Sequence, residues 1–108
     1  MTIQVVILHS AENDLKDLRS YLLRNFGQQT WQLAYRGIKA AVARLAHFPL
    51  EGAVPDELAR LNLTQFRQVI SGKNRILYEV RPDMIAVHLI ADTRRDYPSL
   101  LISRLTDP

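Results

Sequence analysis

Five cationic side chains lie in and around a stretch of the second half of the chain that is predicted to form a small β-sheet. Most are arginines, whose planar guanidinium groups bind phosphate or carboxylate through paired hydrogen bonds. If Arg75 begins its strand and Arg94 and Arg95 end the next one, antiparallel pairing brings all three to one end of the sheet. The predicted cationic cluster consists of Arg67, Lys73, Arg75, Arg94 and Arg95, and Tyr97 follows it closely.

Such a cluster could bind the phosphates of a nucleic acid or an acidic protein surface. In a ribonuclease it could also stabilise a pentavalent phosphorane while a tyrosine or a cation transfers protons, and the residues for that role would be Arg75, Arg94 and Tyr97. The alternative is that the arginines only form ion pairs with neighbouring acidic residues, which are Glu79, Asp92 and Asp96. We favour binding because several cations converge on one end of the sheet.

The sequence lacks the usual motifs of hydrolases, phosphate-binding loops and metal sites. The three histidines have no metal-binding spacing, and His88, inside a predicted strand, is interpreted as a surface or half-buried residue. Gly72 stands alone, so there is no glycine-rich phosphate loop, and no serine lies in a nucleophile elbow. The absence of cysteine excludes disulfides and thiolate ligands. We therefore expect no metal and no cofactor.

The composition describes an ordinary globular chain with a modest positive charge. Its 108 residues predict one domain over residues 1–108, and 47% of them are hydrophobic. Fourteen cations, eleven of them arginine, oppose eleven anions to give a net charge of +3. This charge alone does not separate a nucleic-acid partner from a solvated surface. No apolar run is long enough to cross a membrane and no signal peptide is recognisable, so we expect no membrane association and a cytoplasmic location.

The N-terminal half is predicted to be a strand followed by two helices. Residues 3–8 are a β-branched run typical of a buried strand. Ser10 is expected to cap a helix that ends at Gly27, and Thr30 to cap a second helix. The short connection predicts an antiparallel helix hairpin, with apolar stripes that we interpret as core. Gly37 in the second stripe would let the two helices approach closely.

The C-terminal half is predicted to be three strands and a short helix. Turns at residues 71–74 and 81–83 separate the strands, and Pro98 begins the helix. Alternating apolar residues predict one buried and one partly solvated sheet face. Members of the buried face are Ile76, Tyr78, Val80, Ile85, Val87 and Leu89. The predicted fold class is α+β, with the helix hairpin packed on a four-stranded antiparallel layer formed by the first strand and the three-stranded meander.

Several short motifs resemble the second half of bacterial toxins of the ParE/RelE superfamily. They are PLEG at 49–52, FRQVISG at 66–72, RILYEV at 75–80 and TRRD at 93–96. The family pattern is P-x-x-G, an R-[EQ] strand, a glycine turn, Y-R-I-x-Y-x-V and an apolar strand that ends in arginines. The N-terminal elements match in order and length, so the resemblance spans nearly the whole chain. Two departures are Asn74, where the family usually has Tyr, and Ala91-Asp92, where ParE members often have His-Gly.

The resemblance implies the toxin of a type II toxin–antitoxin pair. An antitoxin would wrap its C-terminal segment around the helix hairpin and the sheet, with a toxin–antitoxin hetero-oligomer as the resting form. We therefore expect apolar surface to remain on these elements. The antitoxin-binding residues expected on the hairpin are Leu15, Leu18, Leu22, Ile38, Val42 and Leu45.

The resemblance also offers two targets. Toxins similar to ParE inhibit DNA gyrase and are not nucleases, whereas toxins similar to RelE cleave mRNA on the ribosome. The RelE arginines fall on Arg75 and Arg94, but the RelE tyrosine lies later in the C-terminal helix than Tyr97. The lysine-rich strand of RelE is represented here only by Arg67 and Lys73. We expect a gyrase inhibitor acting through the last strand and the C-terminal helix, with an mRNA endonuclease or a non-toxic interaction module as the alternatives.

Overall fold

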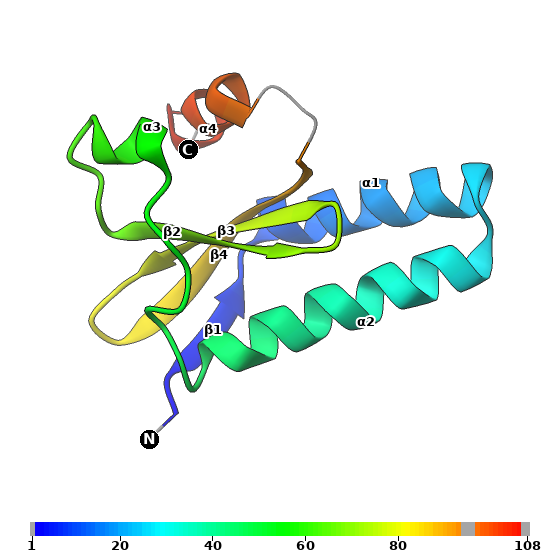
Figure 1. The fold of residues 1–108 in the computed structure, drawn as a ribbon, viewed down its shortest axis with the longest axis horizontal. Helices are drawn as coiled ribbons and strands as arrows, with labels where there is room; N and C mark the ends of the chain where they lie inside the picture. Colours follow the sequence, from blue (N-terminus) through cyan, green and yellow to red (C-terminus); the bar gives the residue numbers. More distant parts are fainter. Residues whose placement is uncertain (1, 94–96, 107–108) are drawn as a thin grey trace.

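The chain folds as an α+β protein in the element order that its sequence predicts (Figure 1). The computed structural model describes residues 2–93 and 97–106. The elements are β1 (Gln4–Ile7), α1 (His9–Asn25), α2 (Gln28–Leu45), α3 (Asp56–Ala59), β2 (Phe66–Ser71), β3 (Asn74–Val80), β4 (Met84–Asp92) and α4 (Tyr97–Thr106). None of the helices in the described part of the chain is long and apolar enough to cross a membrane.

Helices α1 and α2 form the predicted hairpin, but neither predicted side-chain cap is present. Gly27 has a φ of +96°, and its amide donates to the carbonyl oxygen of Leu22, so this glycine both ends α1 and precedes α2. Because α1 already begins at His9, Ser10 lies inside the helix and its hydroxyl donates to the carbonyl oxygen of His88 instead. Thr30 is likewise inside α2.

The sheet has the strand order β1-β4-β3-β2 and is mixed, not fully antiparallel as we expected. Strands β2, β3 and β4 form the predicted antiparallel meander, whereas β1 pairs with β4 in parallel, up to Ile7 opposite Val87. The helix hairpin explains this direction. It returns the chain to the level where β1 began, as the hydrogen bond from the amide of Ile3 to the carbonyl oxygen of Ala46 indicates. Strand β2, and after two turns β4, therefore run in the same direction as β1.

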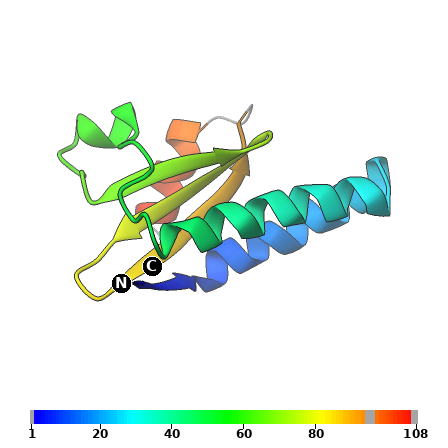
Figure 2. The same ribbon diagram turned by 60° about the horizontal axis from the view of Figure 1, so that its bottom comes forward.

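Both faces of the sheet are covered, so the prediction of one partly solvated face was wrong for β3 and β4 (Figure 2). The hairpin packs on one face, where Ile38 and Leu45 contact the strands. On the other face, Leu58 and Leu63, from α3 and just after it, and Leu100 of α4 cover a second cluster. The strand residues of the first cluster are Ile76, Tyr78, Ile85, Val87 and Ile90, and those of the second are Phe66, Leu77, Leu89 and Ala91.

A β-bulge explains why Leu89 is not on the predicted face. Tyr78 pairs with Val87 and Leu77 pairs with Leu89, so His88 is an extra residue that interrupts the alternation of β4. Val87 therefore faces the helix hairpin while Leu89 faces α3 and α4.

The loop between α2 and β2 covers the outer edge of the sheet. Ala53 forms an antiparallel bridge with Gln68, and the amide of Gly52 donates to the buried hydroxyl of Tyr78 at 2.9 Å. A side chain at position 52 would overlap the main chain of Gln68, so this glycine allows the loop to approach β2. Gly37 has a similar role, but its close neighbour is Ser71 of β2, 2.7 Å from where a Cβ would lie, and not helix α1 as we had expected.

Candidate functional site

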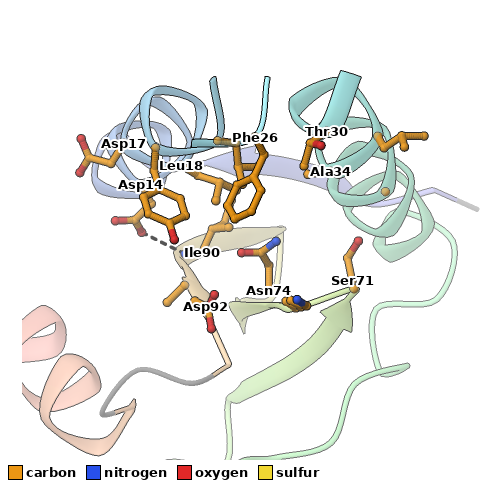
Figure 3. A pocket seen from close by; sticks show the side chains of 17 residues that line it. Asp14, Asp17, Leu18, Phe26, Thr30, Ala34, Ser71, Asn74, Ile90 and Asp92 are labelled. Carbon is orange, nitrogen blue, oxygen red and sulfur yellow. Dashed lines mark hydrogen bonds between the residues drawn. The ribbon is translucent and has the colours of Figure 1, made fainter. Parts of the chain in front are cut away.

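A groove of about 890 Å³ separates the outer half of the helix hairpin from the end of the sheet (Figure 3). Its upper walls are the facing sides of α1 and α2, and its floor is formed by the β2–β3 turn and the last residues of β4. The apolar wall residues are Leu18, Tyr21, Leu22, Phe26, Leu33 and Ala34. The floor includes Ser71, Lys73, Asn74, Ile90 and Asp92.

The groove exists because α1 is longer than the strand beneath it. The amide of Leu8, just before α1, donates to the carbonyl oxygen of Val87, five residues before the end of β4. Those five residues span roughly 17 Å, whereas the 17 residues of α1 span about 26 Å. The hairpin therefore extends beyond the sheet (Figure 1). Apolar side chains at its outer end have no strand to cover them, and Phe26 and Leu33 are 62% and 61% exposed.

An ion pair between α1 and α4 borders this groove. The Asp14 carboxylate accepts hydrogen bonds from both terminal nitrogens of Arg104, at 2.9 and 3.0 Å, and from the amide of Ile90 at 2.9 Å. Arg104 also donates to the carbonyl oxygen of His88 at 2.7 Å. These contacts satisfy main-chain groups of β4 beyond the point where its pairing with β1 ends, and they fix α4 against α1.

Sequence reasoning missed this arrangement. Asp14 and Arg104 are 90 positions apart, so no local spacing connects them. No signal in the sequence marks the bulge beside these contacts, because His88 fits a regular alternation with Ile85, Val87 and Leu89.

The structure brings part of the predicted cationic cluster together. The carbonyl oxygen of Lys73 accepts a hydrogen bond from the amide of Thr93 at 2.7 Å, so the end of β4 lies beside the β2–β3 turn. Arg75 is at the same end of the sheet, and its guanidinium lies 3.4 Å from the side-chain oxygen of Gln68. Arg94 and Arg95 lie outside the described residues, and Tyr97 is the first residue of α4.

Arg67 does not join this group. Arg67 is opposite Tyr78 in the register of β2 and β3, towards the end of these strands that is far from the β2–β3 turn. It is also on the other sheet face from Arg75. Its guanidinium donates to the main-chain oxygen of Gly52 at 2.7 Å, and so holds the loop over the sheet edge. The prediction that all the cations gather at one end is therefore wrong for Arg67.

Glu79 forms a separate polar network on the face covered by α3 and α4. One carboxylate oxygen lies 2.9 Å from Nε2 of His88 and 2.9 Å from Nε of Arg81. Burial alone would raise the pKa of Glu79, but the hydrogen bonds from His88 and Arg81 outweigh it and hold that pKa below its ordinary value. The His88 ring also contacts Phe66 edge to face, with centroids 5.3 Å apart. His88 is thus a half-buried structural residue, as its position in a strand had suggested.

No cluster of three or more metal-ligating side chains occurs in residues 2–93 and 97–106. The described site is an apolar groove with a polar floor. It is bordered by the β2–β3 turn, which carries Lys73 and is called the cationic turn below. This arrangement is suited to binding a protein segment.

Comparisons with known proteins identify the family of the chain. The family model for the ParE toxin of the type II toxin–antitoxin system parDE matches residues 5–97. The chain belongs to the ParE toxin family. A chain of the chromosomal ParDE toxin–antitoxin system from P. aeruginosa has a similar fold, with a TM-score of 0.67 and 16% identity over 84% of this chain and 96% of that one. Among curated proteins, no match was found.

As a member of the ParE family this toxin has an antitoxin as its partner. The six hairpin residues predicted to bind the antitoxin differ from one another in their exposure to solvent. Ile38 and Leu45 are buried in the core beneath the hairpin. Leu15 and Val42 are partly buried against the same core. Leu18 packs against that core and also lines the groove, and Leu22 lines the groove. The accessible part of the predicted surface is therefore at the outer end of the hairpin.

Proposed function

We propose that this protein inhibits DNA gyrase and is neutralised by an antitoxin segment that binds in the groove. The observation that carries the gyrase proposal is the match of residues 5–97 to the ParE family model, since ParE-like toxins, unlike RelE-like ones, act on gyrase. Under this proposal the protein is not an enzyme and acts in the cytoplasm, where gyrase is found.

The groove is suited to an amphipathic protein segment. Its walls combine exposed large apolar side chains with partly buried leucines, such as Phe26 beside Leu22. A patch of this kind in a folded chain usually marks a protein-binding surface. Burying Phe26 and Leu33 beneath an antitoxin would complete the core that the sheet is too short to complete.

The gyrase-binding surface is assigned to the last strand and α4, with the cationic turn beside them. Ile102 of α4 is 58% exposed, and Lys73 in the turn is exposed as well. The Asp14–Arg104 ion pair fixes α4 at the border of the groove. An antitoxin bound in the groove would therefore lie next to the surface used for gyrase, which would account for neutralisation by steric exclusion.

A ribosome-dependent mRNA endonuclease is the second candidate, and one observation favours it. Lys73 and Arg75 are at the same end of the sheet as the chain that leads to Arg94 and Tyr97. Under that reading these cations would bind the scissile phosphate.

One pair of assays separates the two functions. The purified toxin is added to gyrase with plasmid DNA, and separately to a reconstituted translation system with a labelled mRNA. We expect loss of supercoiling and intact mRNA. Cleavage of the mRNA that disappears in Arg75→Ala, but persists in a matched variant of an exposed helix arginine, Arg36→Ala, would overturn the gyrase proposal. Expression without any growth defect would point to an interaction module that is not toxic.

A further inference from the structure

We propose that Asn74 determines which antitoxin the groove accepts, by hydrogen bonding to a polar side chain that the bound segment inserts opposite it. This inference rests on the proposed function of the groove. It adds a chemical requirement to that function: an otherwise apolar segment must carry one group, such as a carboxamide or a hydroxyl, that can both donate and accept.

The position of Asn74 is the first observation. It begins β3 and pairs with Ser71 of β2 and Asp92 of β4, in the centre of the groove floor. Figure 3 shows its carboxamide pointing up into the space between α1 and α2, below Phe26. Asn74 is only 8% exposed, although the groove itself is open to solvent.

The second observation is that the Asn74 carboxamide forms no hydrogen bond with any residue in 2–93 or 97–106, while its polar atoms remain accessible from the groove. A carboxamide has two donor hydrogens and an acceptor oxygen, and buried polar groups in folded proteins are nearly always paired. The β2–β3 turn does not explain the residue, because the left-handed conformation of that turn is at Gly72, with a φ of +58°. In the free toxin the carboxamide is therefore open to water in the groove, and a segment bound there would have to replace that water.

Its surroundings turn this amide into a selective element. Leu18, Phe26 and Ile90 line the space around it, so a bound segment would exclude water from the site. An apolar group placed there would bury the amide without a hydrogen-bond partner. This costs much more free energy than replacing both hydrogen-bonding partners by apolar groups. A site built around a hydrogen bond rejects a partner that lacks it more strongly than an apolar pocket rejects a wrong shape.

The test uses the toxin and its cognate antitoxin, purified as a complex and then separated. Dissociation constants are measured for wild-type toxin and for Asn74→Leu, which has a similar size but no polar group. We expect Asn74→Leu to bind at least about tenfold more weakly, because the partner group loses its hydrogen bond on burial. Asn74→Ala provides a second variant if the leucine does not fit, and Asn13→Leu, an exposed position on α1 outside the groove, is the matched control.

A second arm identifies the partner group. Polar residues of the antitoxin C-terminal segment are replaced one at a time by apolar residues of similar size, and each variant is measured against both toxins. One replacement should weaken binding to the wild type and restore binding to Asn74→Leu, which gives a coupling that a purely structural role of Asn74 would not produce.

The outcomes separate the inference from the proposed function. If Phe26→Asp abolishes binding while Asn74→Leu binds as tightly as wild type, the groove is the antitoxin site and the role of Asn74 is overturned. If neither substitution changes the dissociation constant, the antitoxin binds elsewhere, and both the role of Asn74 and the assignment of the groove as the antitoxin site are overturned. Thermal melting of each free toxin variant checks that a loss of affinity is not a loss of folding.

Discussion

The inner and outer halves of the helix hairpin carry the same kind of apolar stripe but bury it against different things. In the inner half, Ile38 and Leu45 are covered by the sheet and are almost completely inaccessible to solvent. In the outer half, Phe26 and Leu33 extend past the end of the sheet and remain mostly exposed. Helical periodicity therefore shows which side of a helix is apolar, but the lengths of the neighbouring strands determine whether the chain itself or a partner covers it.

The largest expected effect tests the inner half. Leu45→Ala should lower the free energy of unfolding by about 2–5 kcal/mol, because it leaves a cavity in a fully buried site. Leu33→Ala, the matched substitution in the outer half, should change it by less than about 0.5 kcal/mol. Chemical denaturation of both variants measures the difference. Equal losses would mean that the two halves are not distinct in the free protein.

The next prediction tests the outer half as a binding surface. Phe26→Ala should weaken antitoxin binding by about 1–3 kcal/mol while leaving the stability of the free toxin nearly unchanged, since its ring is exposed in the groove until a partner covers it. Isothermal titration with the antitoxin gives the change in affinity. Phe48→Ala removes a ring that is 57% exposed but lies outside the groove, and it should bind normally. A similar loss for both would show that exposure, not location, explains the effect.

A third prediction concerns α4, which borders the outer half. Arg104→Ala removes the hydrogen bonds to Asp14 and to the carbonyl oxygen of His88, and leaves a half-buried carboxylate without its cation. We expect the free energy of unfolding to fall by about 1–3 kcal/mol. Hydrogen exchange should show that this loss falls mainly on α4, with the amides of the inner hairpin still protected. Uniform loss of protection would mean that α4 is part of the cooperative core.

The sequence was sufficient for the part of the fold that depends on local periodicity. The two helices, the three-stranded meander and their order follow from spacing that each segment carries by itself. The direction of β1 does not, because it depends on where the helix hairpin returns the chain. The sorting of Leu89 to the second face also could not be predicted, since a bulge of one residue at His88 reverses the alternation after it.

The candidate site was less predictable because it depends on distances between elements. The cations were recognisable by type, but their faces and ends depend on strand register, which placed Arg67 away from Arg75. The groove arises from the unequal lengths of α1 and the end of β4, a quantity that no single segment contains. Asn74 was visible as a departure from a family pattern, and only the structure shows that its carboxamide faces the groove.

The smallest expected effect extends the comparison to the other face of the sheet, where burial is polar as well as apolar. Folding lowers the pKa of Glu79 from its ordinary value of 4.5, because hydrogen bonds from His88 and Arg81 outweigh the cost of burial. The stability that the carboxylate provides is therefore fully present above the ordinary pKa and is lost as the pH falls through the lower, folded-state pKa. Glu79→Gln lacks this ionisation, so denaturation curves of the two proteins should differ near neutral pH and converge in acid. A constant difference at every pH would show that Glu79 contributes through packing and not through its charge.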